Sequence, residues 1–135
     1  MQNNYLLCTV CGYDYTHFLT SINLIGDDDY NLLRVSFDGI DIDLSKNKLG
    51  YPYRSQGNIN LIFFCEDQHY FYKSFDGHKG SIHLDDNPIM DQLCTYLNSE
   101  AKKKKLEFNA FYDNSLKNKI ADFFINYQEV NNTSK

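Results

Sequence analysis

The amino-acid sequence predicts an α+β fold: an antiparallel β-sheet built from hairpins (residues ~5–85), followed by two C-terminal helices (~88–102 and ~115–129). Two observations carry this prediction. Apolar residues alternate with polar ones through much of the chain, and near its end they recur at helical spacing. A run of strands before a run of helices is typical of the α+β class. With 135 residues, 42% of them hydrophobic, we expect a single domain over residues 1–135.

The strongest strand signal lies in "RVSFDGIDIDL", residues 34–44. Apolar residues alternate with polar ones on both sides of Asp38-Gly39, which indicates a β-hairpin with a type I′ turn. One face of this hairpin should be buried, and Asp41 and Asp43 should point towards water.

A second hairpin is expected in "INLIFFCEDQHYFYKSF", residues 59–75. Two runs of aromatic and β-branched residues, which favour strands, are separated there by a polar turn at residues 66–69. The stretch "SIHLD", residues 81–85, adds a short strand.

Both helices are predicted from their apolar period and their start signals. Asn87 is a suitable N-cap, and Pro88 is favourable at the first helical position. The apolar stripe that follows has a spacing of three and four and includes Cys94, which we expect in the core. Asn114 or Ser115 is expected to cap the second helix.

The charge of the chain is acidic and unevenly distributed. Residues 1–100 carry 6 basic and 14 acidic side chains, a net charge of −8, whereas the remainder carries +3 and includes the run Lys102–Lys105. An acidic body opposes electrostatic capture of nucleic acid and suits a basic protein partner. No apolar run is long enough for a bilayer and no signal-peptide pattern is present, so we expect a cytoplasmic protein with reduced cysteines and no membrane contact.

Cysteine and histidine side chains form two pairs that are typical of a metal site. Cys8 and Cys11 precede Gly12, which accepts the positive φ that a tight metal-binding turn requires. Cys65 and His69 lie four residues apart, at the polar turn of the second expected hairpin. Two ligands from each turn would form a tetrahedral Cys3His zinc site. Two other interpretations stay open, namely buried thiols that pack as small apolar groups and a redox pair.

Residues 6–15 and 61–72 together resemble the two knuckles of zinc-ribbon proteins, in which ligand pairs on two hairpins share one zinc ion. The resemblance implies that the two cysteine and histidine pairs are the ligands of a structural zinc. The second pair departs from the ribbon pattern, because three residues separate its members and one of them is a histidine. The spacer between the pairs is also longer than a minimal ribbon needs.

The function we expect is that of a small, acidic, non-enzymatic protein-binding domain. An inhibitor, immunity protein or antitoxin of this kind would mask a basic surface of a larger partner. The contacts are expected from the acidic hairpin, through Asp38, Asp41 and Asp43, and from Tyr51 and Tyr53 in the loop that follows it.

Two other functions remain open. A zinc-ribbon module could bind nucleic acid through the lysine run and through aromatic rings such as Tyr70 and Tyr72. Alternatively, His69, His78 and His83 could form a hydrolytic metal site with neighbouring aspartates, although no motif fixes them on one face.

Overall fold

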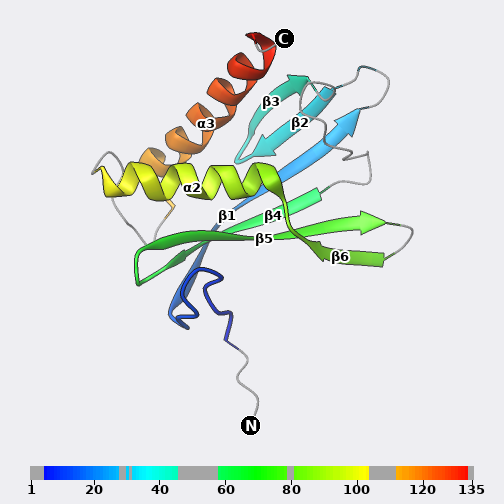
Figure 1. Cartoon of the computed structure of the whole chain (residues 1–135). Coiled ribbons are helices and arrows are strands. Elements are labelled where there is room, and N and C mark those ends of the chain that lie inside the picture. Colours follow the sequence, from blue (N-terminus) through cyan, green and yellow to red (C-terminus); the bar gives the residue numbers. More distant parts are fainter. Residues whose placement is uncertain are drawn as a thin grey trace.

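The structure is a computed structural model, and it describes residues 5–27, 30, 32–45, 58–78, 81–103 and 112–133. Within these ranges a six-stranded sheet is followed by two helices, which confirms the predicted α+β fold (Figure 1). The elements are β1 (Thr16–Asp27), β2 (Leu32–Phe37), β3 (Ile40–Ser45), β4 (Asn58–Cys65), β5 (His69–His78), β6 (Ser81–Asp85), α2 (Pro88–Lys102) and α3 (Asn114–Thr133). The sheet begins at Thr16, so residues 5–15 contain no strand.

All neighbouring strands are antiparallel, in the order β3-β2-β1-β4-β5-β6. The central pair, β1 and β4, is distant in sequence, because the β2–β3 hairpin lies between the two strands along the chain. Its register pairs Thr16 with Cys65. The segment before β1 therefore lies beside the turn between β4 and β5.

The two predicted hairpins are present. In the β2–β3 turn Asp38 and Gly39 have φ values of 49° and 78°, and positive φ at both central positions is the pattern of a type I′ turn. The β4–β5 hairpin turns within the predicted polar segment.

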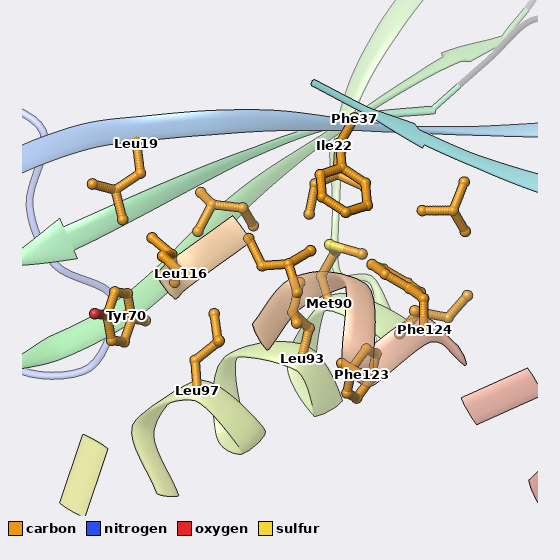
Figure 2. Packing of buried hydrophobic residues seen from close by; sticks show 14 of the residues in the cluster. Leu19, Ile22, Phe37, Tyr70, Met90, Leu93, Leu97, Leu116, Phe123 and Phe124 are labelled. Carbon is orange, nitrogen blue, oxygen red and sulfur yellow. The ribbon is translucent and has the colours of Figure 1, made fainter. Parts of the chain in front are cut away.

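Both helices cover the same face of the sheet. α2 packs on β5, α3 packs on β3, and the helices also contact each other (Figure 1). Figure 2 shows side chains from the sheet, such as Ile22 and Tyr70, in one layer with Met90 and Leu93 of α2 and Phe124 of α3. This layer of buried apolar side chains is the main core. Neither described helix has the length and apolar character needed to span a membrane.

The start of α2 agrees with the prediction. The Asn87 side-chain oxygen accepts hydrogen bonds from the backbone N–H groups of Ile89 and Met90, and Pro88 is the first helical residue. Cys94 is buried on the apolar stripe, as expected.

The predicted cap of α3 was wrong by one residue. Asp113, rather than Asn114 or Ser115, is the N-cap, because its carboxylate accepts a hydrogen bond from the backbone N–H of Leu116. A carboxylate at this position also interacts favourably with the positive end of the helix dipole. The helix continues to Thr133, beyond the predicted end.

A buried polar network ties the start of α2 to the sheet. Asn58, Asn60, Ser74 and Asn87 are each at most 2% exposed. The Asn87 amide donates to the side-chain oxygens of Asn58 (3.0 Å) and Asn60 (3.1 Å), and the Asn58 amide donates to Ser74 (3.0 Å). Because these buried amides find partners in one another, their burial costs little.

Candidate metal centre

Cys8, Cys11, Cys65 and His69 come together in the structure. One potential ligand atom from each, a thiol sulfur or a ring nitrogen, lies within 4.8 Å of all the others. These are the four residues that the sequence predicted. Each cysteine is free of a disulfide bond.

The pairing of the central strands brings the two turns together. The backbone N–H of Glu66 donates to the carbonyl of Tyr15 (3.0 Å), which extends the β1–β4 ladder beyond Thr16 and Cys65. The Thr16 hydroxyl also donates to the carbonyl of Leu6 (3.0 Å). We call residues 8–12 the first knuckle and residues 65–69 the second knuckle.

Each knuckle contains a hydrogen bond from a backbone N–H group to a cysteine sulfur. The backbone N–H of Val10 donates to Sγ of Cys8 (3.3 Å), and the N–H of Asp67 donates to Sγ of Cys65 (3.4 Å). A donor aimed at sulfur stabilises the negative charge of a thiolate, which is the form that binds metal. The first pair lies in a loop rather than in a hairpin, so only the second knuckle has the ribbon arrangement.

Each knuckle also contains one residue with left-handed backbone. Gly12 has a φ of +78°, which confirms the positive φ expected for this glycine, and Gln68 has a φ of +67°. A non-glycine residue rarely adopts this conformation, so the fold holds Gln68 there at some cost in energy.

The sulfur atoms of Cys11 and Cys65 are 3.7 Å apart. A disulfide bond would need about 2.05 Å. Two thiolates at about 2.3 Å from a tetrahedral zinc ion lie about 3.8 Å apart. The observed separation therefore fits two ligands of one ion.

Burial shapes the chemistry of the cluster. Cys8 and Cys65 are only 3% and 0% exposed, whereas Cys11 is exposed. Burial is the main cause that raises the pKa of the Cys65 thiol to about 12, and the N–H of Asp67 opposes it. Metal coordination at this sulfur would therefore release a proton.

A ring nitrogen of the cluster lacks a hydrogen bond. Within the described part of the chain, Nδ1 of His69 is buried and has no partner. Buried polar atoms are nearly always paired, so an orphaned imidazole nitrogen beside three thiols needs an explanation. Coordination of a metal through Nδ1 would satisfy it.

A small apolar cluster supports the metal ligands on the face of the sheet opposite the helices, which we call the outer face. Cys8 and Cys65 pack with Phe63 and Phe71, whose rings stack at 5.2 Å. Successive strand residues point to opposite faces, so these side chains point away from the main core. Their apolar surroundings limit the access of water to the two buried sulfur atoms.

The acidic hairpin predicted for partner binding has its own partners within the chain. The pairs are Asp38 with Lys117 (3.2 Å), Asp43 with Arg34 (2.8 Å) and Asp41 with Ser36 (2.6 Å). Tyr51 and Tyr53 lie outside the described residues. A contact of these five residues with a partner stays a prediction.

The histidines proposed for a hydrolytic site do not converge. His69 and His78 are the first and last residues of β5, about 30 Å apart along a strand of this length. His83 pairs with Asp76 near the far end. One ion cannot bind all three histidines.

The rings proposed to stack on nucleic-acid bases point towards the helices. Tyr70 is 1% exposed and lies in the main core. The Tyr72 hydroxyl donates to Asp91 (2.7 Å) and accepts from the backbone N–H of Asn87 (2.9 Å). The Tyr70 ring is therefore not available as an open stacking platform, and the half-buried Tyr72 is tied to the start of α2 through its hydroxyl.

The aromatic residues that follow the first knuckle were not among the predicted site residues. Tyr13 and Tyr15 are exposed, and their rings contact each other with centroids 5.3 Å apart. The aromatic content of "GYDYTHF", directly after Cys11, is a signal that could have identified them.

No family model matches the chain, and comparisons with curated proteins and with solved structures likewise find no match. The Cys3His cluster suggests a zinc-binding site, and no family assignment accompanies it.

Proposed function

We propose that this chain is a non-enzymatic protein-binding domain whose first knuckle is held on the sheet by a structural zinc ion. The ligands are Cys8, Cys11, Cys65 and His69. The observation that carries the proposal is the convergence of their ligand atoms within 4.8 Å. Three thiolates and one imidazole are a common donor set of structural zinc sites, and soft sulfur ligands favour zinc over magnesium or calcium.

The number of ligands supports a structural rather than a catalytic ion. Four protein ligands complete a tetrahedron, whereas a catalytic zinc has three and keeps one position for water or substrate. The unpaired Nδ1 of His69 is further support, because coordination gives this buried atom a partner.

The protein-binding part of the proposal is supported by charge and by exposed apolar surface. The chain has a net charge of −5, and large apolar side chains are exposed on the outer face of the sheet. Such a domain suits binding to a partner that has a basic surface. An inhibitor, immunity protein or antitoxin in the cytoplasm would mask a surface of this kind.

Metal analysis of the purified protein tests the zinc site. We expect one zinc per chain by elemental analysis, and spectra of tetrahedral thiolate coordination when cobalt(II) replaces zinc. Cys65→Ser should lose the metal. Cys94→Ala is the matched control and should retain it, because Cys94 is a buried cysteine in the main core. A wild-type protein that binds neither ion under reducing conditions contradicts the zinc site.

The protein-binding role has its own test. We expect the zinc-loaded chain to form a stable one-to-one complex with a host protein that survives gel filtration and nuclease treatment. A chain that forms no such complex, but binds oligonucleotides with an affinity that falls steeply with salt, would instead favour the nucleic-acid function.

A further inference from the structure

Exposed apolar side chains are concentrated around the metal centre. In the described part of the chain, seven of the thirteen exposed large hydrophobic side chains lie within residues 5–18. Four of them, which we call the knuckle surface, are Val10, Tyr13, Tyr15 and Phe18, with exposed fractions between 42% and 60%. Isolated exposed apolar residues are normal, but such a concentration marks an interaction site.

The knuckle surface is attached directly to the metal ligands. The carbonyl of Tyr13 accepts a hydrogen bond from the N–H of Cys8 (2.9 Å), and that of Tyr15 accepts from the N–H of Glu66, next to Cys65. The Phe18 and Phe63 rings make an edge-type contact with centroids 5.9 Å apart, and Phe63 packs with Cys8 and Cys65. An ion that fixes both knuckles would therefore also fix these aromatic rings.

Carboxylates accompany the exposed rings. Asp14, Glu66 and Asp67 are all exposed, and Glu66 pairs with His17 at 3.0 Å. In the described residues, Asp14 and Asp67 make no ion pair. Asp14 lies between Tyr13 and Tyr15 in the chain, and the backbone N–H of Glu66 donates to the carbonyl of Tyr15, so both acidic residues are neighbours of the exposed rings.

We propose that the knuckle surface is the contact site for the protein partner, and that the partner inserts a segment rich in arginine and apolar side chains. A guanidinium group stacks on tyrosine rings and forms paired hydrogen bonds with carboxylates. Apolar side chains of the same segment would cover Val10 and Phe18. This inference rests on the proposed protein-binding function, and it moves the contact from the β2–β3 hairpin to the metal centre.

The charge distribution favours a cationic protein segment over nucleic acid. Exposed aromatic rings alone would suit the bases of a single strand, which every stacking surface accommodates. Phosphates, however, need cationic partners, whereas Asp14, Glu66 and Asp67 present negative charge beside the rings. A single-stranded oligonucleotide is therefore the competing ligand in the test.

Two synthetic peptides of equal length serve as probes, one alternating arginine with leucine and the other alternating glutamate with leucine. Binding to the zinc-loaded full chain is measured by fluorescence anisotropy. We expect the arginine peptide to bind and the glutamate peptide to bind at least tenfold more weakly. Removal of zinc should weaken the binding of the arginine peptide at least tenfold, because the rings lose their fixed positions.

Substitutions locate the site. The double variant Tyr13→Ser/Tyr15→Ser should bind the arginine peptide at least tenfold more weakly. The variant protein should still contain one zinc per chain. Tyr30→Ser is the matched control and should have no effect, because this exposed tyrosine lies beyond the other end of β1. Asp14→Asn with Asp67→Asn should weaken binding several-fold and reduce its salt dependence, whereas Asp41→Asn on the β2–β3 hairpin should change nothing.

Three results would overturn the inference. They are equal affinity for the two peptides, unchanged binding in the Tyr13 and Tyr15 variant, and tighter binding of a single-stranded oligonucleotide than of the arginine peptide. The proposed function is tested separately by zinc content and by the complex with a host protein. A host complex that survives the tyrosine substitutions refutes this contact site and leaves the protein-binding function intact.

Discussion

The two faces of the sheet are stabilised in different ways. Among the residues that the structure describes, the cluster between the sheet and the helices contains nineteen buried side chains, whereas the cluster around Cys8 and Cys65 on the outer face contains four. Since hydrophobic stabilisation scales with the apolar area removed from water, packing in the main core contributes far more stabilisation than packing in the outer cluster. The outer cluster is much smaller, so a metal ion held by Cys8, Cys11, Cys65 and His69 would add a cross-link where packing contributes little.

The two faces also differ in whether their buried polar groups have hydrogen-bond partners. The Asn58, Asn60 and Asn87 amides find their partners in one another and in the backbone, and the network is complete without a ligand. The metal centre leaves Nδ1 of His69 unpaired. One buried polar cluster thus has its partners within the chain, whereas the other contains a buried nitrogen that a metal ion could pair.

The largest effect is expected in the main core. Phe124→Ala should lower the free energy of unfolding by about 3–5 kcal/mol, because Phe124 is fully buried and truncation leaves a cavity. Urea unfolding with and without zinc measures the loss, which should be the same in both conditions. A loss that appears only in the zinc-loaded protein would mean that the two faces are not independent.

Removal of zinc should have the next largest effect. With free zinc at 100 times its dissociation constant, chelation should lower the free energy of unfolding by about 2.7 kcal/mol. The helical circular dichroism signal should persist, because both helices belong to the main core. Loss of that signal on chelation would show that the outer face also holds the core together.

Substitution of Asn87 tests the polar network. Asn87→Ala removes the cap of α2 and two amide contacts, so it should cost about 1–3 kcal/mol in unfolding free energy. Asn87→Ser, which keeps a capping oxygen, should cost less. Zinc affinity, measured by competition with a chelator, should be unchanged in both variants, and a changed affinity would contradict the separation of the two regions.

The smallest effects are expected at the left-handed residues of the knuckles, with opposite signs. Gly12→Ala should cost about 1 kcal/mol from backbone strain alone, because open space surrounds the position of a new Cβ atom. Gln68→Gly should relieve strain and stabilise the zinc-loaded protein by about 0.5–1 kcal/mol. Thermal unfolding of both variants measures the difference. If both variants changed the unfolding free energy in the same direction, one of the two knuckles would not have the described backbone conformation.

Local signals made much of the fold predictable. Asp38-Gly39 between alternating runs identified one hairpin, and Asn87-Pro88 identified the start of α2. No comparable local signal marked the bounds of β1, and two features explain this. A bulge between Phe18 and Thr20 interrupts the alternation, and apolar residues lie on both faces of the strand, with Phe18 exposed and Ile22 buried.

The ligands of the candidate site were also predictable, because the pairs Cys8–Cys11 and Cys65–His69 each have local metal-binding spacing. Their convergence was not predictable from spacing, since it depends on the pairing of β1 with β4, which are distant in sequence. The internal pairing of Asp43 with Arg34 across a hairpin was missed as well, although these residues sit opposite each other. Cross-strand partners can be read once the register is known, but the register itself is set by tertiary packing.

The alignment of Thr16 with Cys65 in the middle of the sheet has a consequence for the folding chain. A slip by one residue would shift one turn past the other by about 3.3 Å and point Cys65 to the opposite face. Such a chain could not assemble its four ligands. Metal binding would therefore stabilise only chains in which β1 and β4 pair in the correct register.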